Sequence, residues 1–155
     1  MQQKSLESLL NLAIAREEAA YAFYTELRER IADREARDTL EFLAGEERKH
    51  RDFLVKYKAG KIAAGTMQMT EVIDYKIAEH LEMPDPEKDR DSKEVYLIAA
   101  HRELAAYNFY NDLAKLHPDG EVKEMLLKMA NQELKHKEKV EYLYANTAFP
   151  QTAGG

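Results

Sequence analysis

The chain has 155 residues, a formal net charge of -6 and no cysteine. Its length is typical of one domain with a hydrophobic core, and the lack of cysteine excludes disulfides, zinc fingers, iron–sulfur clusters and thiol catalysis. The negative charge, without a basic cluster, argues against nucleic acid as a partner. No stretch approaches the roughly 18 apolar residues of a membrane span, and no signal-type apolar block follows Met1. We therefore expect a cytoplasmic protein that does not interact with a membrane.

Helical periodicity extends over most of the chain. Four long helices are expected, and their approximate bounds are 4–30, 34–57, 92–116 and 118–146. Asp33 is the expected N-cap of the second helix, Asp91 or Ser92 begins the third, and Pro118-Asp119 opens the fourth. A crossover, residues 58–90, separates the two hairpins 4–57 and 91–146 and contains a predicted short helix at 70–81. The predicted domain spans residues 1–146 and is followed by a frayed tail, 147–155.

The two predicted hairpins repeat each other at a shift of 86 residues without a gap. The shift places Glu17, Tyr24, Glu47 and His50 on identical residues. Their counterparts are Glu103, Tyr110, Glu133 and His136. Two matching hairpins predict an all-α four-helix bundle, and the long crossover is typical of ferritin-like bundles.

The inward seam of each predicted helix is apolar or aromatic except at its middle. There, the first and third helices carry one glutamate, and the second and fourth carry Glu-x-x-His, whose side chains project from one helix face. The six residues are Glu17, Glu47, His50, Glu103, Glu133 and His136. By contrast, charge runs such as residues 135–139 are interpreted as exposed faces around the seam.

A single glutamate or histidine in a seam is usually a hydrogen-bonded or partly exposed core residue, but six at one depth are not explained in that way. Glu17 precedes Glu47 by 30 residues, and Glu103 precedes Glu133 by 30, so antiparallel helices bring each pair to one level. Four buried carboxylates without partners would cost several kcal/mol each. Two divalent cations would balance them, and each cation would gain one histidine. The sequence therefore predicts a pair of metal ions.

Carboxylate and imidazole donors without sulfur suit iron or manganese, with zinc as a passive occupant. One glutamate from each of two helices and Glu-x-x-His from each of the other two is the ligand pattern of di-iron and di-manganese carboxylate proteins. We predict two iron ions, with manganese or a mixed-metal pair as the alternatives.

With these motifs, the sequence resembles the rubrerythrin family of the ferritin-like superfamily over residues 6–57 and 96–144. The resemblance implies that Glu47 and Glu133 bridge the metals and that Glu17 and Glu103 are terminal ligands. His50 and His136 would each complete one metal.

The resemblance also implies that Tyr24 and Tyr110 lie close to the ligands, where their hydroxyls could orient carboxylates or intercept stray oxidants. Aromatic core packing is the alternative role for these two tyrosines. It is the expected role for Tyr21 and Tyr107.

The sequence departs from the family in two respects. Typical members carry a cysteine-ligated rubredoxin domain, whereas this cysteine-free chain would need a separate electron donor, such as a rubredoxin-like protein or another reductant. The family also tends to have a further glutamate, linked to iron movement and to preference for peroxide, where this chain has Ala106.

The resemblance implies reduction of hydrogen peroxide, or of O2, at a carboxylate-bridged di-iron site in defence against oxidative stress. An iron-binding or ferroxidase protein of iron storage or buffering is the main alternative, and an oxygenase acting on an organic substrate is a third. The resemblance further implies a homodimer, in which the crossover would permit exchange of hairpins between protomers.

Overall fold

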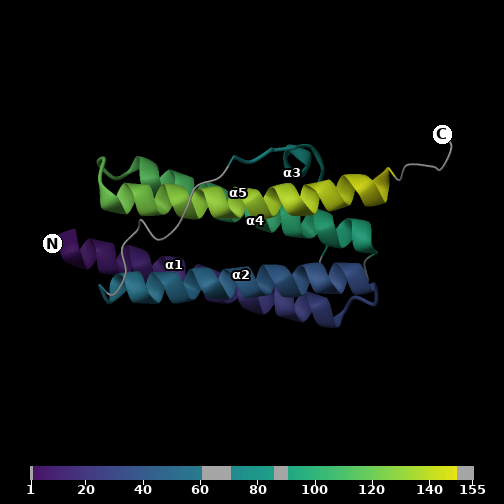
Figure 1. The fold of residues 1–155 in the computed structure, drawn as a ribbon, viewed down its shortest axis with the longest axis horizontal. Helices are drawn as coiled ribbons and strands as arrows, with labels where there is room; N and C mark the ends of the chain where they lie inside the picture. Colours follow the sequence, from purple (N-terminus) through teal and green to yellow (C-terminus); the bar gives the residue numbers. More distant parts are fainter. Residues whose placement is uncertain (1, 61–70, 86–90, 150–155) are drawn as a thin grey trace.

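The chain folds into two helical hairpins packed side by side in the computed structural model, which describes residues 2–60, 71–85 and 91–149 (Figure 1). The first hairpin consists of α1 (Gln2–Glu29) and α2 (Arg34–Lys58). The second consists of α4 (Ser92–Lys115) and α5 (Glu121–Ala148), and the short α3 (Ile77–His80) lies between the hairpins in sequence. The described part of the chain contains no strand. The predicted fold class, an all-α ferritin-like bundle of two repeated hairpins joined by a long crossover, is confirmed.

Aspartate side chains begin one helix of each hairpin. Asp33 accepts a hydrogen bond from the backbone N–H of Ala36, and Asp91 accepts one from Glu94, both at 2.9 Å. Each carboxylate thereby satisfies a backbone donor that has no partner inside the first helical turn. Asp33 is the N-cap of α2, as predicted, and Asp91 is the N-cap of α4.

Helix α5 begins and ends later than the sequence predicts. Pro118 and Asp119 form the turn rather than the first helical residues, because Gly120 adopts a positive φ of 153° that favours glycine, and helix follows from Glu121. At the other end, α5 continues to Ala148 and so includes the first two residues of the predicted tail. Residues 150–155 lie outside the described residues.

The helix predicted at 70–81 is wrong over most of its length, because only Ile77–His80 is helical. Residue 70 lies outside the described residues, and residues 71–76 are not helical. Lys76 adopts a left-handed backbone conformation with φ 55°, and the Asp74 side chain accepts a hydrogen bond from the Lys76 N–H at 3.0 Å. This local bond competes with the helical pattern.

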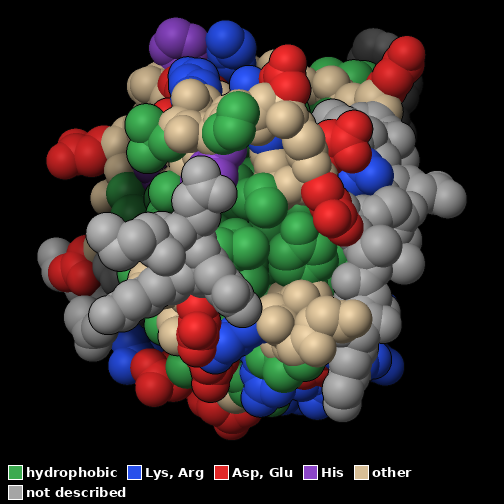
Figure 2. Space-filling view, turned by 90° about the vertical axis from the view of Figure 1, so that its left-hand side faces the viewer, with side chains coloured by type: hydrophobic (Ala, Val, Ile, Leu, Met, Phe, Trp, Pro, Cys, Tyr) green, Lys and Arg blue, Asp and Glu red, His purple; other side chains and the backbone are tan. Residues whose placement is uncertain are grey.

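Two apolar clusters fill the bundle, one toward each end. The cluster near the α1–α2 turn includes Leu27, Leu40 and Ile98, and the other includes Leu54 and Leu126. The end-on view in Figure 2 shows apolar side chains gathered at the centre of the second of these ends. The six predicted ligands occupy the level between the clusters, where little water reaches them.

The face of α5 beside the seam holds a buried lysine. Lys137 has 0% exposure, and its Nζ lies 2.6 Å from Asp74 Oδ1, 2.8 Å from Glu79 Oε1 and 3.0 Å from Glu141 Oε2. Glu141 also accepts a hydrogen bond from the Ala78 N–H at 2.8 Å. The interpretation of residues 135–139 as an exposed face is therefore wrong at Lys137, because the crossover folds over it.

Burial by itself lowers the pKa of the Lys137 ammonium, but its bonds to Asp74, Glu79 and Glu141 raise that pKa above the ordinary value. The lysine is therefore charged and holds the crossover on α5.

Among the residues that the structure describes, no helix is long and apolar enough to cross a membrane.

We expect Lys137→Met to lower the free energy of unfolding of the metal-free protein by about 3 kcal/mol, because it leaves the buried Glu141 carboxylate without a cationic partner. Urea denaturation followed by circular dichroism measures the change. The exposed Lys135 provides the control, and Lys135→Met should change stability by less than about 0.5 kcal/mol. Equal effects of the two substitutions would contradict a role for Lys137 in holding the crossover.

Candidate metal centre

All six predicted ligands lie together at the middle of the bundle. Each long helix contributes one glutamate, and α2 and α5 each contribute a histidine one turn further along. Their exposures are at most 6%: Glu17 2%, Glu47 1%, His50 6%, Glu103 1%, Glu133 0% and His136 3%. The helical spacing explains this convergence, because every one of these residues replaces an apolar seam residue.

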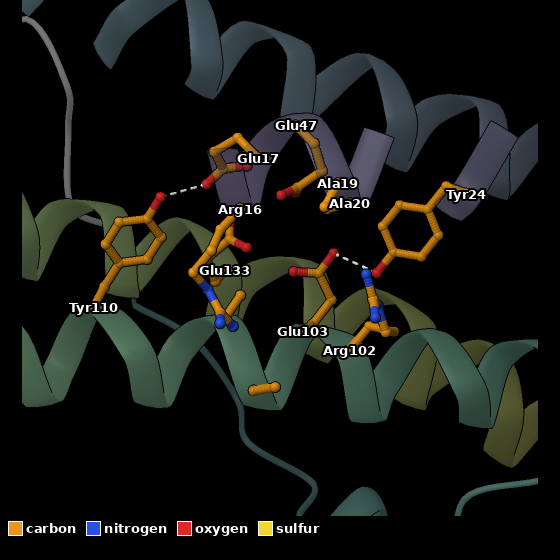
Figure 3. A pocket seen from close by; sticks show the side chains of 12 residues that line it. Arg16, Glu17, Ala19, Ala20, Tyr24, Glu47, Arg102, Glu103, Tyr110 and Glu133 are labelled. Carbon is orange, nitrogen blue, oxygen red and sulfur yellow. Dashed lines mark hydrogen bonds between the residues drawn. The ribbon is translucent and has the colours of Figure 1, made fainter. Parts of the chain in front are cut away.

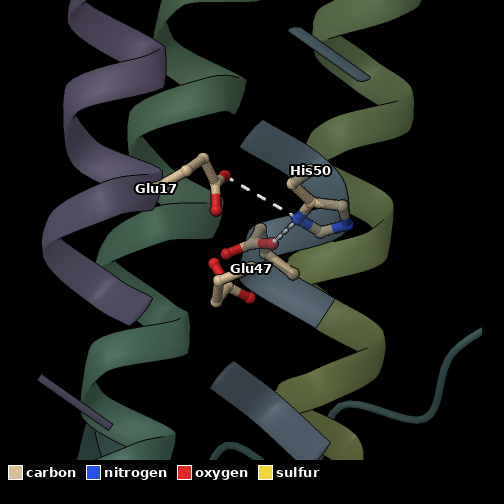
Figure 4. Close-up of side chains that lie close together, drawn as sticks. Glu17, Glu47 and His50 are labelled. Atoms are coloured by element: carbon tan, nitrogen blue, oxygen red, sulfur yellow. Dashed lines mark ion pairs between the residues drawn. The ribbon is translucent and has the colours of Figure 1, made fainter. Parts of the chain in front are cut away.

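One half of the centre is formed by Glu17, Glu47, His50 and Glu133, which offer ligand atoms that all lie within 4.8 Å of one another. His50 Nδ1 lies 2.8 Å from Glu133 Oε1 and 3.7 Å from Glu17 Oε1. Figure 4 shows Glu17 on α1 and Glu47 and His50 on α2 pointing toward the same space between the helices.

The other half is formed by Glu47, Glu103, Glu133 and His136, again with ligand atoms within 4.8 Å of one another. His136 Nδ1 lies 3.3 Å from Glu47 Oε1 and 3.7 Å from Glu103 Oε2. Glu47 and Glu133 belong to both halves, whereas each of the other four residues belongs to one. The two histidine rings stack with centroids 5.5 Å apart.

Two buried tyrosines connect the hairpins at this level. The Tyr24 hydroxyl donates to Glu103 Oε1 at 2.9 Å, and the Tyr110 hydroxyl donates to Glu17 Oε1 at 2.6 Å. Each tyrosine therefore contacts the glutamate of the opposite hairpin rather than the one two turns before it in its own helix. Figure 3 shows the two rings on opposite sides of the carboxylates.

Burial raises the pKa of both tyrosines well above the ordinary value, and the nearby carboxylates raise it further. Both hydroxyls thus remain protonated donors. Burial raises the pKa of Glu17, but the nearby His50 imidazole and the hydrogen bond from Tyr110 stabilise its charged form, so that its pKa is lowered overall.

The two glutamates shared by both halves show the opposite shift. Burial raises the pKa of Glu47 and of Glu133 well above the ordinary value, and the charges of neighbouring carboxylates raise both further. Burial tends to lower the pKa of His136, but the attraction of the surrounding glutamates raises it well above the ordinary value. The metal-free centre therefore lowers its excess negative charge by binding protons.

Atoms without partners test whether cations fit here. Buried side-chain atoms that form no properly oriented hydrogen bond occur in all six residues, even where ion-pair contacts are close: Glu17 Oε2, Glu47 Oε1, His50 Nδ1, Glu103 Oε2, Glu133 Oε1 and Oε2, and His136 Nδ1. Buried polar atoms are normally paired, and all of these are oxygen or nitrogen donors that metal ions accept. The donor set therefore fits two cations held by four carboxylates and two imidazoles.

A further acidic group, Asp74, Glu79 and Glu141, resembles a cation site in its spacing. The Lys137 ammonium already lies between these three carboxylates. This group therefore acts as a lysine-binding site rather than as a second metal centre.

Glu46, which the sequence pattern does not single out, lies on the outer side of His136. Its Oε1 is 3.5 Å from His136 Nε2, the ring nitrogen that faces away from the carboxylates, and His136 is the main reason that the pKa of Glu46 is lowered to about 2. A carboxylate beside the outer nitrogen of a metal-binding histidine orients the ring and increases its basicity. The 86-residue shift places Gln132 at the corresponding position, so the repeat does not reveal this role.

Fold and site together define a ferritin-like helical bundle with buried glutamate and histidine clusters that indicate the binding of two metal ions. The sequence model of the rubrerythrin family matches residues 1–58, which comprise the first hairpin with Glu17, Glu47 and His50. This match confirms the resemblance over the first hairpin and is consistent with a rubrerythrin-family ferritin-like protein. Neither a curated protein nor a solved structure matches the chain significantly.

We expect metal binding to release protons, because Glu47, Glu133 and His136 have raised pKa values in the metal-free protein and metal ions bind their deprotonated forms. Titration with Mn²⁺ at pH 7 in a weakly buffered indicator solution should release about one to three protons per metal pair. Because protons compete with the metal, the apparent affinity should fall as the pH is lowered.

The control for this titration is Glu18→Gln, which alters an exposed glutamate next to Glu17 in the sequence and should leave proton release unchanged. Glu133→Gln should decrease both proton release and the number of bound ions. Full metal binding by the unaltered protein without proton release would contradict the raised pKa values.

Proposed function

We propose that the chain is a rubrerythrin-like oxidoreductase that binds two iron ions and reduces hydrogen peroxide, or less favourably O2, in defence against oxidative stress. The observation that carries the proposal is the pair of four-residue clusters sharing Glu47 and Glu133. The rubrerythrin match over the first hairpin supports it independently.

The ligand roles follow the sharing of residues between the clusters. Glu47 and Glu133 are proposed to bridge the two metals. Glu17 and His50 would complete one coordination sphere, and Glu103 and His136 would complete the other. Oxygen and imidazole donors favour iron or manganese, with a mixed pair or bound zinc as alternatives.

Two ferrous ions held here would supply the two electrons that, with two protons, convert one hydrogen peroxide molecule to two waters, and a separate reductant would restore the ferrous state. The chain contributes the surroundings of this reaction. Its two apolar clusters limit access of water, and carboxylates can change between bridging and terminal binding as the metal charge changes.

Tyr24 and Tyr110 are proposed to orient the terminal carboxylates through their hydrogen bonds to Glu103 and Glu17. A fixed donor restricts each glutamate to one rotamer and leaves its other oxygen for the metal. The tyrosines also lie close enough to the centre to be oxidised in place of more distant residues.

Ala106 replaces the additional glutamate of the family and leaves a six-ligand site. We therefore propose peroxide reduction without the carboxylate exchange that the additional residue would allow. The electron donor is proposed to be a separate rubredoxin-like protein or other reductant. We also propose a cytoplasmic homodimer, with exchange of hairpins between protomers as a variant of it.

The test is stopped-flow absorbance of anaerobically reduced protein loaded with two irons per chain. We expect ferric absorbance in the near ultraviolet to appear at least about ten times faster with peroxide than with the same concentration of O2, a difference of about 1.4 kcal/mol in activation free energy. Glu133→Gln is the control that removes a shared ligand.

Reduced, iron-loaded protein that reacts with neither oxidant would overturn the proposal. Oxidation mainly by O2, followed by uptake of further iron into a large cage, would instead establish iron handling as the function.

We expect Tyr24→Phe and Tyr110→Phe each to retain two metals and to slow the reaction with peroxide by about tenfold, because the terminal glutamate loses the donor that orients it. The exposed Tyr142 provides the matched control, and Tyr142→Phe should react like the unaltered protein. Unchanged rates in both buried variants would show that Tyr24 and Tyr110 serve only in packing.

A further inference from the structure

A cavity of about 210 Å³ lies between α1 and α4 and extends to the proposed metal centre. Its base consists of glutamates of the centre, and Tyr24 and Tyr110 stand at its two sides (Figure 3). The walls are made of small side chains from the two helices: Ala19, Ala20, Ala105 and Ala106. The base contains buried carboxylate oxygens without hydrogen-bond partners, so the cavity reaches atoms that are available to bind.

The alanines keep this side of the centre open. Ala20 and Ala106 occupy matching positions in the repeat, at the level where longer side chains would fill the space between α1 and α4. The short side chain of Ala106 lines the cavity and adds no carboxylate to the centre.

Two arginines flank the cavity in a reciprocal arrangement. Arg16 on α1 places its guanidinium 4.3 Å from the centroid of the Phe109 ring on α4, and Arg102 on α4 places its own 4.1 Å from the ring of Phe23 on α1. The 86-residue shift relates both pairs. Each arginine therefore crosses the space between the helices and is held by an aromatic face.

The partners of these two guanidiniums are aromatic rings rather than carboxylates in the part of the chain described. Apart from the glutamates of the centre, Arg16 and Arg102 are the charged residues among the described residues that line the cavity. Two divalent cations would balance the four glutamates, so the charge remaining at the opening would be positive. Such an opening attracts anions, admits uncharged molecules and repels cations.

We propose that this cavity is the substrate entrance of the metal centre, and that Arg16 and Arg102 make it selective for small uncharged or anionic oxidants over divalent cations. The inference rests on the proposed function and deepens it, because it assigns the oxidant, rather than Fe²⁺, to this route.

Azide binding to the ferric, metal-loaded protein tests the entrance without requiring turnover, since azide is a small anion whose binding changes the visible spectrum. At low ionic strength, Arg16→Gln/Arg102→Gln should lower the association rate constant about tenfold, and the difference should disappear at about 0.5 M salt. Arg16→Lys/Arg102→Lys retains the charge and should restore most of the rate.

Narrowing the cavity tests the route itself. Ala20→Leu should slow azide binding and the reaction with peroxide by about tenfold or more, whereas Ala15→Leu, at an exposed position of α1 outside the cavity, should leave both unchanged.

Uptake of Co²⁺ by the metal-free protein tests the selectivity against cations. Arg16→Gln/Arg102→Gln should speed this uptake, and an unchanged rate of uptake would overturn the proposed selectivity.

Equal association rate constants for azide in the unaltered, Arg16→Gln/Arg102→Gln and Ala20→Leu proteins would overturn the proposal that this cavity is the entrance, even if the protein reduces peroxide. Conversely, the azide association rate could depend on Arg16 and Arg102 in a protein whose reduced form does not react with peroxide. That result would support the proposed entrance and overturn the proposed function. A chain that binds no metal pair would overturn both.

Discussion

Four carboxylates and two imidazoles lie in one desolvated layer between two apolar clusters, and this concentration of charge constrains much of the structure. The helices position these groups but give them too few protein partners, so unpartnered atoms occur in all six residues. In the absence of cations, the shared Glu47 and Glu133 have raised pKa values. Two metal ions would neutralise the buried carboxylates more completely than bound protons do. The stability of the bundle is therefore connected with its capacity to bind two ions.

The bonds around this layer cross between hairpins. Tyr24 of the first hairpin contacts Glu103 of the second, and Tyr110 of the second contacts Glu17 of the first. The arginine–aromatic pairs cross the same interface in the same reciprocal way. A hairpin alone would therefore lack the tyrosine donor to its own Glu17 or Glu103, and this mutual dependence helps to fix how the two hairpins face each other.

Departures from the repeat make the two halves of the centre different. Glu46 approaches the outer nitrogen of His136, whereas Gln132 stands at the corresponding sequence position. The crossover also covers α5, where Lys137 binds Asp74, Glu79 and Glu141. One face of the bundle is thus closed by an ion-paired segment, while the α1–α4 side retains a cavity that reaches the centre.

The sequence by itself determined the all-α bundle, the two hairpins and the set of six residues that meet at its middle. Helical periodicity and a repeat without gaps can both be read from the sequence, and each unexpected glutamate or histidine stands out against an apolar seam. Local signals also placed the Asp33 cap. They were insufficient in the crossover, whose predicted helix is reduced to Ile77–His80. There, Asp74 accepts a hydrogen bond from the Lys76 N–H and, with Glu79, also binds Lys137 of α5.

Only the tertiary structure decided the burial of Lys137, the approach of Glu46 to His136 and the pairing of each tyrosine with the opposite hairpin. These contacts join residues on different elements, and their partners are ordinary charged or polar residues in the sequence. A lysine among other charges is normally solvated, and it becomes buried here only because three carboxylates from two segments converge on it.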